Sequence, residues 1–138
     1  MGGTPTAMTY ALGAMVLWGA WGILANHALE HMSETAVLLA TYAVAIGVVI
    51  ALNPSVSDSL PTTIGLVFAI GAGITMCLGT LLYYQSVKVG KLSIVPAIPA
   101  LYFVVTTLYG VTILDESLNL SQVAGIILAV IAIVLLTR

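Results

Sequence analysis

The sequence predicts an all-α integral membrane protein, built as a bundle of five transmembrane helices. Of its 138 residues, 61% are hydrophobic and only 6% are charged, and the mean hydropathy is +1.18. A soluble domain of this size needs polar side chains over most of its residues, because most of them lie at or near the surface. Lipid must therefore cover most of this chain.

Five apolar segments follow one another, each near the ~20 residues that a helix needs to cross ~30 Å of hydrocarbon. Strands are excluded, because a strand of a membrane barrel has ~10 residues and alternates apolar with polar side chains. The breaks between the segments are too short to hold a soluble domain. We expect one transmembrane domain over residues 1–138, with spans at 7–29, 35–52, 62–87, 94–114 and 118–136.

The third span carries small residues at helical spacing. Gly65, Ala69 and Gly73 recur every four residues, and an adjacent stripe holds Gly71, Thr75 and Gly79. Small residues at this spacing let two helix backbones approach closely in lipid. The stripe therefore predicts helix packing, with a partner helix either in this chain or in another.

The fourth span opens with SIVPAIPALY, which holds two prolines three residues apart. If Ser93 caps the helix, Pro96 falls in the first turn, where no intrahelical N–H bond is lost. Pro99 lies a full turn inside, so it should bend the helix and leave the Val95 carbonyl without its donor. Two interpretations remain open, a kink between packed helices and the wall of a wet cavity.

Charge and cysteine content exclude several classes of function. A net charge of −2 makes no basic patch for nucleic acid. The single cysteine, Cys77, lies in an apolar run, where packing is its expected role. The N-terminus lacks the basic region of a signal peptide and continues as a span.

The basic residues predict the orientation of the chain. All three lie on the side of the membrane that holds the C-terminus: Lys88, Lys91 and Arg138. The positive-inside rule places that side in the cytoplasm.

The sequence HALEH, residues 27–31, matches the H-x-x-E-H pattern of some metalloproteases. It lies where the first span leaves the membrane, and polar residues belong there without any metal. We therefore expect no metal, no cofactor and no enzyme activity, and treat an intramembrane enzyme as the third hypothesis.

Asp115 and Glu116 are expected to cap the fifth helix through its dipole. No charged residue lies in the middle third of a span, so the usual mark of an ion relay is absent.

From Tyr83 to the C-terminus, the sequence resembles the second half of an EamA-type repeat of the drug/metabolite transporter superfamily. The WGAWGILANHAL stretch, residues 18–29, is similar to the first helix of that repeat, although Asn26 stands where the family often has lysine. Typical members carry two repeats in inverted orientation, ten spans in all, and this chain carries one. The matching positions are Tyr83, Tyr84, Gly90, Ser93, Pro96, Pro99, Glu116, Gln122 and Gly125.

The resemblance implies a multi-pass plasma-membrane transporter subunit for a small polar metabolite. It would work as a dimer of five-helix repeats with an aromatic-lined central cavity. An antiparallel homodimer is favoured over a same-orientation dimer or a related five-helix partner chain. The alternative function is a non-transport structural or accessory subunit of a membrane assembly. The residues expected to bind substrate are Trp18, Trp21, Asn26, His27, Tyr84, Gln85, Pro99, Tyr102 and Thr106.

Overall fold

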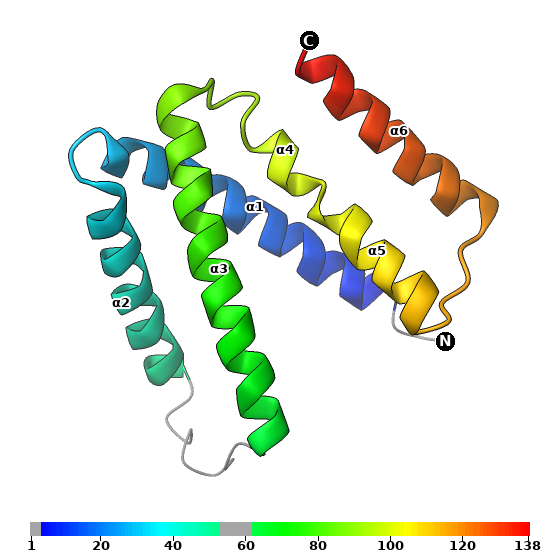
Figure 1. Cartoon of the computed structure of the whole chain (residues 1–138), viewed down its shortest axis with the longest axis horizontal. Helices are drawn as coiled ribbons and strands as arrows, with labels where there is room; N and C mark the ends of the chain where they lie inside the picture. The colour runs from blue at the N-terminus through cyan, green and yellow to red at the C-terminus, as the bar shows by residue number, and fades with distance from the viewer. Residues whose placement is uncertain (1–3, 53–61) are drawn as a thin grey trace. The chain divides into compact units, whose positions relative to one another are not determined.

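A computed structural model describes residues 4–52 and 62–138, with side chains from residue 7 onward in the first helix. The predicted break at 53–61 lies outside the described residues. The described part is helical and contains no strand. Its helices are α1 (Thr4–Leu29), α2 (Glu34–Leu52), α3 (Thr63–Val89), α4 (Ala97–Ala100), α5 (Tyr102–Ile113) and α6 (Leu120–Leu136) (Figure 1).

Three of these helices have the length and apolar composition of membrane spans: Ala7–Leu29, Glu34–Leu52 and Thr63–Val89. The segments Ala97–Ile113 and Leu120–Leu136 are apolar but shorter, at 17 residues or fewer. At the 1.5 Å rise of an α-helix, 17 residues cover about 25 Å. The all-helical membrane class is thus supported, and the count of five spans stays a prediction. The chain divides into two compact units, Met1–Lys88 and Val89–Arg138, described separately below.

The first unit packs at one end, where α1 ends, α2 begins and α3 ends. In Figure 1, α2 and α3 run alongside each other, and the Tyr42 hydroxyl lies 3.5 Å from the Thr80 hydroxyl between them. The rest of each helix is exposed, as lipid contact permits. The buried residues of this unit are Ala25, Leu29, Val37, Leu38, Thr80, Tyr84 and Val87.

Polar contacts fix the connection between α1 and α2 at this end. The Ser33 hydroxyl accepts from the Ala36 N–H at 3.3 Å, and the Ser33 carbonyl accepts from Val37 at 3.0 Å. Ser33 therefore satisfies donors of the first turn of α2, as a serine before a helix commonly does. The Lys88 ammonium then binds the Glu34 carboxylate at 2.9 Å, which links the start of α2 to the end of α3.

In the second unit, the two prolines act differently from the sequence expectation. Pro96 is the N-cap of α4, so the expected cap at Ser93 is wrong. A backbone turn precedes Pro96, and in it the N–H groups of Ile94 and Val95 both donate to the Lys91 carbonyl. The Val95 carbonyl is not left without a donor either. The Ile98 N–H reaches it at 3.3 Å, a three-residue bond in place of the four-residue bond that Pro99 cannot make.

The helix is interrupted at Leu101, two residues after Pro99. The Leu101 N–H donates to Ile98 at 3.1 Å, and the Leu101 carbonyl accepts from Val104 at 2.9 Å. Both bonds span three residues, so the chain passes through a tightened turn here and α5 starts at Tyr102. Proline thus changes the local helical pitch, and the backbone groups stay paired.

The expected capping by Asp115 and Glu116 is wrong. Asp115 has a φ of 54°, a left-handed conformation that continues no helix. The Glu116 N–H donates to the Gly110 carbonyl at 3.1 Å, so this loop closes the end of α5. A Cβ on Gly110 would lie 2.7 Å from a Glu116 carboxylate oxygen, and glycine leaves room for that carboxylate.

The cap of α6 is Asn119, paired with Gln122 in a capping box. The Asn119 side chain accepts from the Gln122 N–H at 3.0 Å, and the Gln122 side chain accepts from the Asn119 N–H at 2.8 Å. The N–H groups of Asn119 and Gln122 are thus paired reciprocally. This box marks where the chain re-enters its last apolar helix.

Asn119→Ala should lower the free energy of unfolding by about 0.5–2 kcal/mol, the usual cost of losing an N-cap side chain. The measurement is denaturant or detergent unfolding of the purified full chain, followed by circular dichroism. Ser117→Ala, in the same exposed loop, is the matched control and should change the midpoint little. An equal loss in both variants would contradict the role of the capping box.

Candidate functional site

Three aromatic rings meet between α1 and α3 in the first unit. Trp21 stacks on Tyr83, with ring centroids 5.4 Å apart and planes inclined by 25°. Tyr84 lies 6.0 Å from Trp21 and 6.1 Å from Tyr83 by the same measure. Such pairs each contribute about 0.5–1.5 kcal/mol beyond simple burial. We call these three residues the aromatic cluster.

The helical spacing of α1 explains why the aromatic cluster forms here. Trp21, Ala25 and Leu29 recur every four residues and share one face of α1, which is buried toward its end. Gly22 lies beside them, and a Cβ at Gly22 would be in ordinary van der Waals contact with the Tyr83 hydroxyl, at 3.4 Å. The Tyr83 side chain therefore reaches the α1 backbone.

Tyr84 is the most enclosed residue of the cluster. Its side chain is 0% exposed, and its hydroxyl has no hydrogen-bond partner among the described residues. A buried polar group without a partner costs about 1–3 kcal/mol. The hydroxyl therefore lies enclosed beside two aromatic rings, without a hydrogen-bond partner among the described residues.

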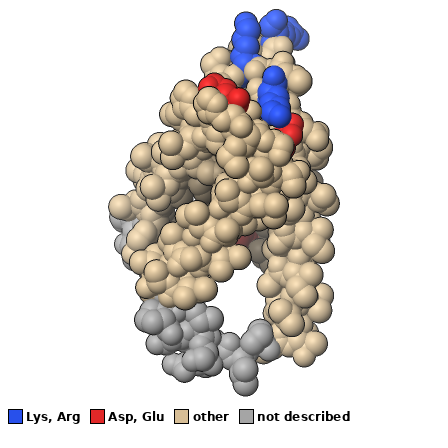
Figure 2. Space-filling view, turned by 90° about the vertical axis from the view of Figure 1, so that its left-hand side faces the viewer, with Lys and Arg blue, Asp and Glu red and all other residues tan. Residues whose placement is uncertain are grey.

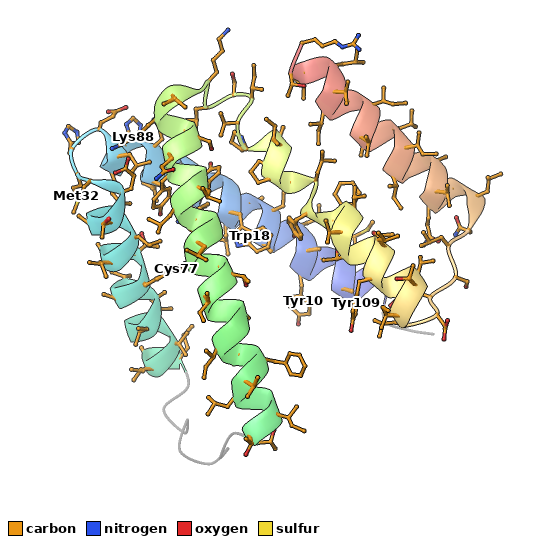
Figure 3. All side chains as sticks on the ribbon, in the orientation of Figure 1. Tyr10, Trp18, Met32, Cys77, Lys88 and Tyr109 are labelled. Carbon is orange, nitrogen blue, oxygen red and sulfur yellow. The ribbon has the colours of Figure 1, made fainter. Side chains whose placement is uncertain are left out.

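A hollow of about 260 Å³ lies beside this packing, at the ends of α1 and α3. Its lining is Asn26, Leu29, Glu30, Val87 and Lys88. Figure 3 places Lys88 near the end of α3, at the same end of the unit as Met32. Polar and apolar side chains thus line one space at the end of the spans. We call it the end hollow.

Two side-chain contacts involve the charged residues of the end hollow. The Lys88 ammonium lies 2.9 Å from Glu34 Oε1, and His27 Nδ1 lies 3.6 Å from Glu30 Oε2. The second distance is too long for a strong hydrogen bond. The remaining visible surface is almost wholly uncharged in Figure 2, as contact with lipid requires.

The structure brings together some of the residues predicted to bind substrate. Trp21 and Tyr84 touch in the aromatic cluster, and Asn26 lines the end hollow. Trp18 is 61% exposed on α1 (Figure 3), and the His27 side chain is 67% exposed. Gln85 is also exposed, on the face of α3 away from this packing.

The other three predicted residues belong to the second unit. Tyr102 is 57% exposed, and Pro99 and Thr106 are exposed as well. The Thr106 hydroxyl donates to the Phe103 carbonyl of its own helix at 3.0 Å. These residues form an open face on the interrupted helix, and their part in a site stays a prediction.

Sequence reasoning did not assign Tyr83, Glu30, Glu34 or Lys88 to a site. One signal was available, because Lys88 follows Tyr84 by four residues and so shares its helix face. The pairing of Lys88 with Glu34 joins different helices and leaves no local pattern. In the HALEH stretch, His31 is exposed, and over the described residues no group of three His, Cys, Asp or Glu could hold a metal ion.

Tyr84→Phe should leave the free energy of unfolding unchanged or raise it by up to about 1 kcal/mol. The reason is that it removes a buried hydroxyl that lacks a partner among the described residues. The measurement is detergent unfolding monitored by circular dichroism. Tyr10→Phe is the control, since Tyr10 is 76% exposed. A clear loss of stability in Tyr84→Phe alone would mean that a bound water or ligand satisfies this hydroxyl.

Comparison with known proteins assigns the amino-acid sequence to a family. The family model described as "EamA-like transporter family" matches residues 5–138. An uncharacterized protein of Methanocaldococcus jannaschii is 35% identical over 72 residues, which are 52% of this chain and 53% of that protein. The match therefore spans about half the length of this curated relative. No solved structure matches the chain. With nearly its whole length covered by the family model, the chain belongs to the EamA-like transporter family.

Proposed function

We propose that the chain is one subunit of a membrane transporter that moves a small polar metabolite and works as a dimer. The observation that carries this proposal is the family match over residues 5–138. A single repeat presents only one half of an inverted-repeat fold, whose substrate site lies at the repeat interface near the bilayer midplane. A second chain would supply the other half.

The open face of the second unit supports a cavity shared with that second chain. Tyr102 and Thr106 are four residues apart, on one face of α5, and both are exposed. The tightened turn at Leu101 lies directly before them. Irregular backbone at membrane depth is tolerated where it is buried in protein or lines a water-filled cavity. We assign this face of the second unit to an aromatic-lined transport path.

Small residues along α3 support association with another chain. A Cβ placed on Gly71, Gly73 or Gly79 would meet no atom within 4 Å among the described residues. Within the described residues of the first unit, these three glycines therefore meet no other helix. Close approach of a second helix is the ordinary use of such a stripe in lipid. An antiparallel homodimer would satisfy both this stripe and the inverted symmetry.

The same open stripe also favours a second candidate function, an accessory subunit that docks on an unrelated membrane protein. The two functions differ in one respect. A transporter needs its polar face of α5 for activity, whereas an accessory subunit needs only the packing stripe.

Tyr102→Ala should lower transport about tenfold or more, because it removes the aromatic wall of the proposed cavity. The measurement is uptake by proteoliposomes of radiolabelled amino acids, sugars and nucleosides, one at a time. The mutated chain should reach the wild-type level in the membrane.

Tyr10→Ala is the matched control, an exposed tyrosine near the start of α1, and should leave uptake unchanged. Equal uptake by Tyr102→Ala and wild type would remove Tyr102 from the transport path. If wild-type proteoliposomes take up none of these compounds above empty liposomes, the accessory function replaces transport.

Topology reporters at the C-terminus should give signal from both sides of the membrane. Only three basic residues, Lys88, Lys91 and Arg138, bias insertion, and so weak a bias permits both orientations. One reporter should be active only in the cytoplasm and the other only outside. Cytoplasmic signal alone would exclude the antiparallel homodimer and favour a same-orientation dimer or a separate inverted partner.

A further inference from the structure

We propose that the end hollow binds a small zwitterion, with Glu30 receiving its ammonium group and Lys88 its anionic group. The transport proposal above uses neither of these side chains. The inference stands apart from transport, since it concerns a binding site at the end of one unit.

The size and place of the end hollow limit what it can hold. Its volume of about 260 Å³ is several times the ~30 Å³ that one water molecule takes up in the liquid, so it has room for a small ligand. Asn26 lies three residues before the end of α1, and Lys88 one residue before the end of α3. The hollow therefore opens at the membrane–water boundary, which solutes and lipid headgroups both reach.

Lys88 keeps binding capacity while it is paired. An ammonium group has three donors, and Glu34 Oε1 takes one of them at 2.9 Å. Two donors remain for an anionic group in the hollow. The pair with Glu34 also holds the Lys88 side chain in place, because it crosses from α3 to α2.

Glu30 keeps acceptor capacity as well. Its Oε2 is 3.6 Å from His27 Nδ1, which is beyond good hydrogen-bond distance. A carboxylate offers about four lone-pair directions, so an ammonium group can be bound. The Asn26 amide adds one acceptor and two donors to the same lining.

Both signs of charge in one small space select for a ligand that carries both. A simple anion would meet the carboxylates of Glu30 and Glu34, and a simple cation would leave the two remaining Lys88 donors without an acceptor. A zwitterion faces each charge with its opposite. Leu29 and Val87, both buried, supply apolar walls for a short carbon segment between the two groups.

The test compares three probes of similar size on the purified full chain in a non-ionic detergent: alanine, its cationic amide and its N-acetylated anion. Calorimetry should give alanine a dissociation constant about tenfold or more below both analogues, equal to about 1.4 kcal/mol or more. A lipid arm uses nanodiscs of mixed phosphatidylethanolamine and phosphatidylglycerol. Native mass spectrometry should then show whether the zwitterionic lipid is retained preferentially.

Binding in the first arm identifies a free solute as the source, and retention in the second identifies a lipid headgroup. Glu30→Gln is the decisive variant, because it leaves the Glu34–Lys88 pair intact, and it should abolish the preference in the responding arm. Lys91→Met is the matched control, since Lys91 does not line the end hollow, and it should change nothing.

The inference is overturned if neither arm prefers the zwitterion, or if Glu30→Gln keeps the preference. Lys88→Met should act like Glu30→Gln, with circular dichroism to confirm that the chain stays helical. Lys88→Arg, which keeps the charge, should retain binding. These measurements need no transport. A chain that transports without this selectivity would contradict the zwitterion site alone, and one that binds without transporting would contradict only the proposed function.

Discussion

Hydrocarbon offers no hydrogen-bond donor or acceptor, so each polar group within a span needs a partner in the protein. The hydroxyls of Thr80 and Thr112 accordingly donate to carbonyls of their own helices, at 2.8 and 2.7 Å. The same constraint shapes the turn after Pro96, where Ile98 supplies the donor that Pro99 lacks. It also explains why the last helix begins with a complete capping box at Asn119. The Tyr84 hydroxyl, which has no partner in the part of the chain that the structure describes, departs from this pattern.

Packing in the first unit gathers at the end where polar groups are available. Lipid tails are as apolar as leucine, so apolar burial drives helices together weakly in a bilayer. The contacts that hold α1, α2 and α3 are accordingly specific ones, namely stacked rings around Trp21 and the ion pair of Lys88 with Glu34. Among the described residues of the first unit, the apolar faces elsewhere stay exposed, including Gly71, Gly73 and Gly79 of α3. Those open faces are what a second chain would cover in the proposed dimer.

The aromatic cluster and the end hollow offer two different chemical environments on neighbouring helix turns. The first is uncharged, with one hydroxyl that has no partner among the described residues. The second carries a carboxylate and an ammonium group at the ends of α1 and α3. The proposed zwitterion site and the proposed transport path therefore use different residues.

The sequence alone determined the membrane class, the helical content and the positions of the apolar segments, because these follow from composition and run length. It also marked Trp21, Asn26 and Tyr84 through a family resemblance. Asp115 and Glu116 were expected to cap the last helix, and Asn119 was not considered. The backbone shows Asp115 in a left-handed conformation after α5 and Asn119 at the N-cap of α6. The pairing of Lys88 with Glu34 and the isolation of the Tyr84 hydroxyl were decided by tertiary structure. Both depend on which helix faces meet, and local sequence does not encode contacts between residues distant along the chain.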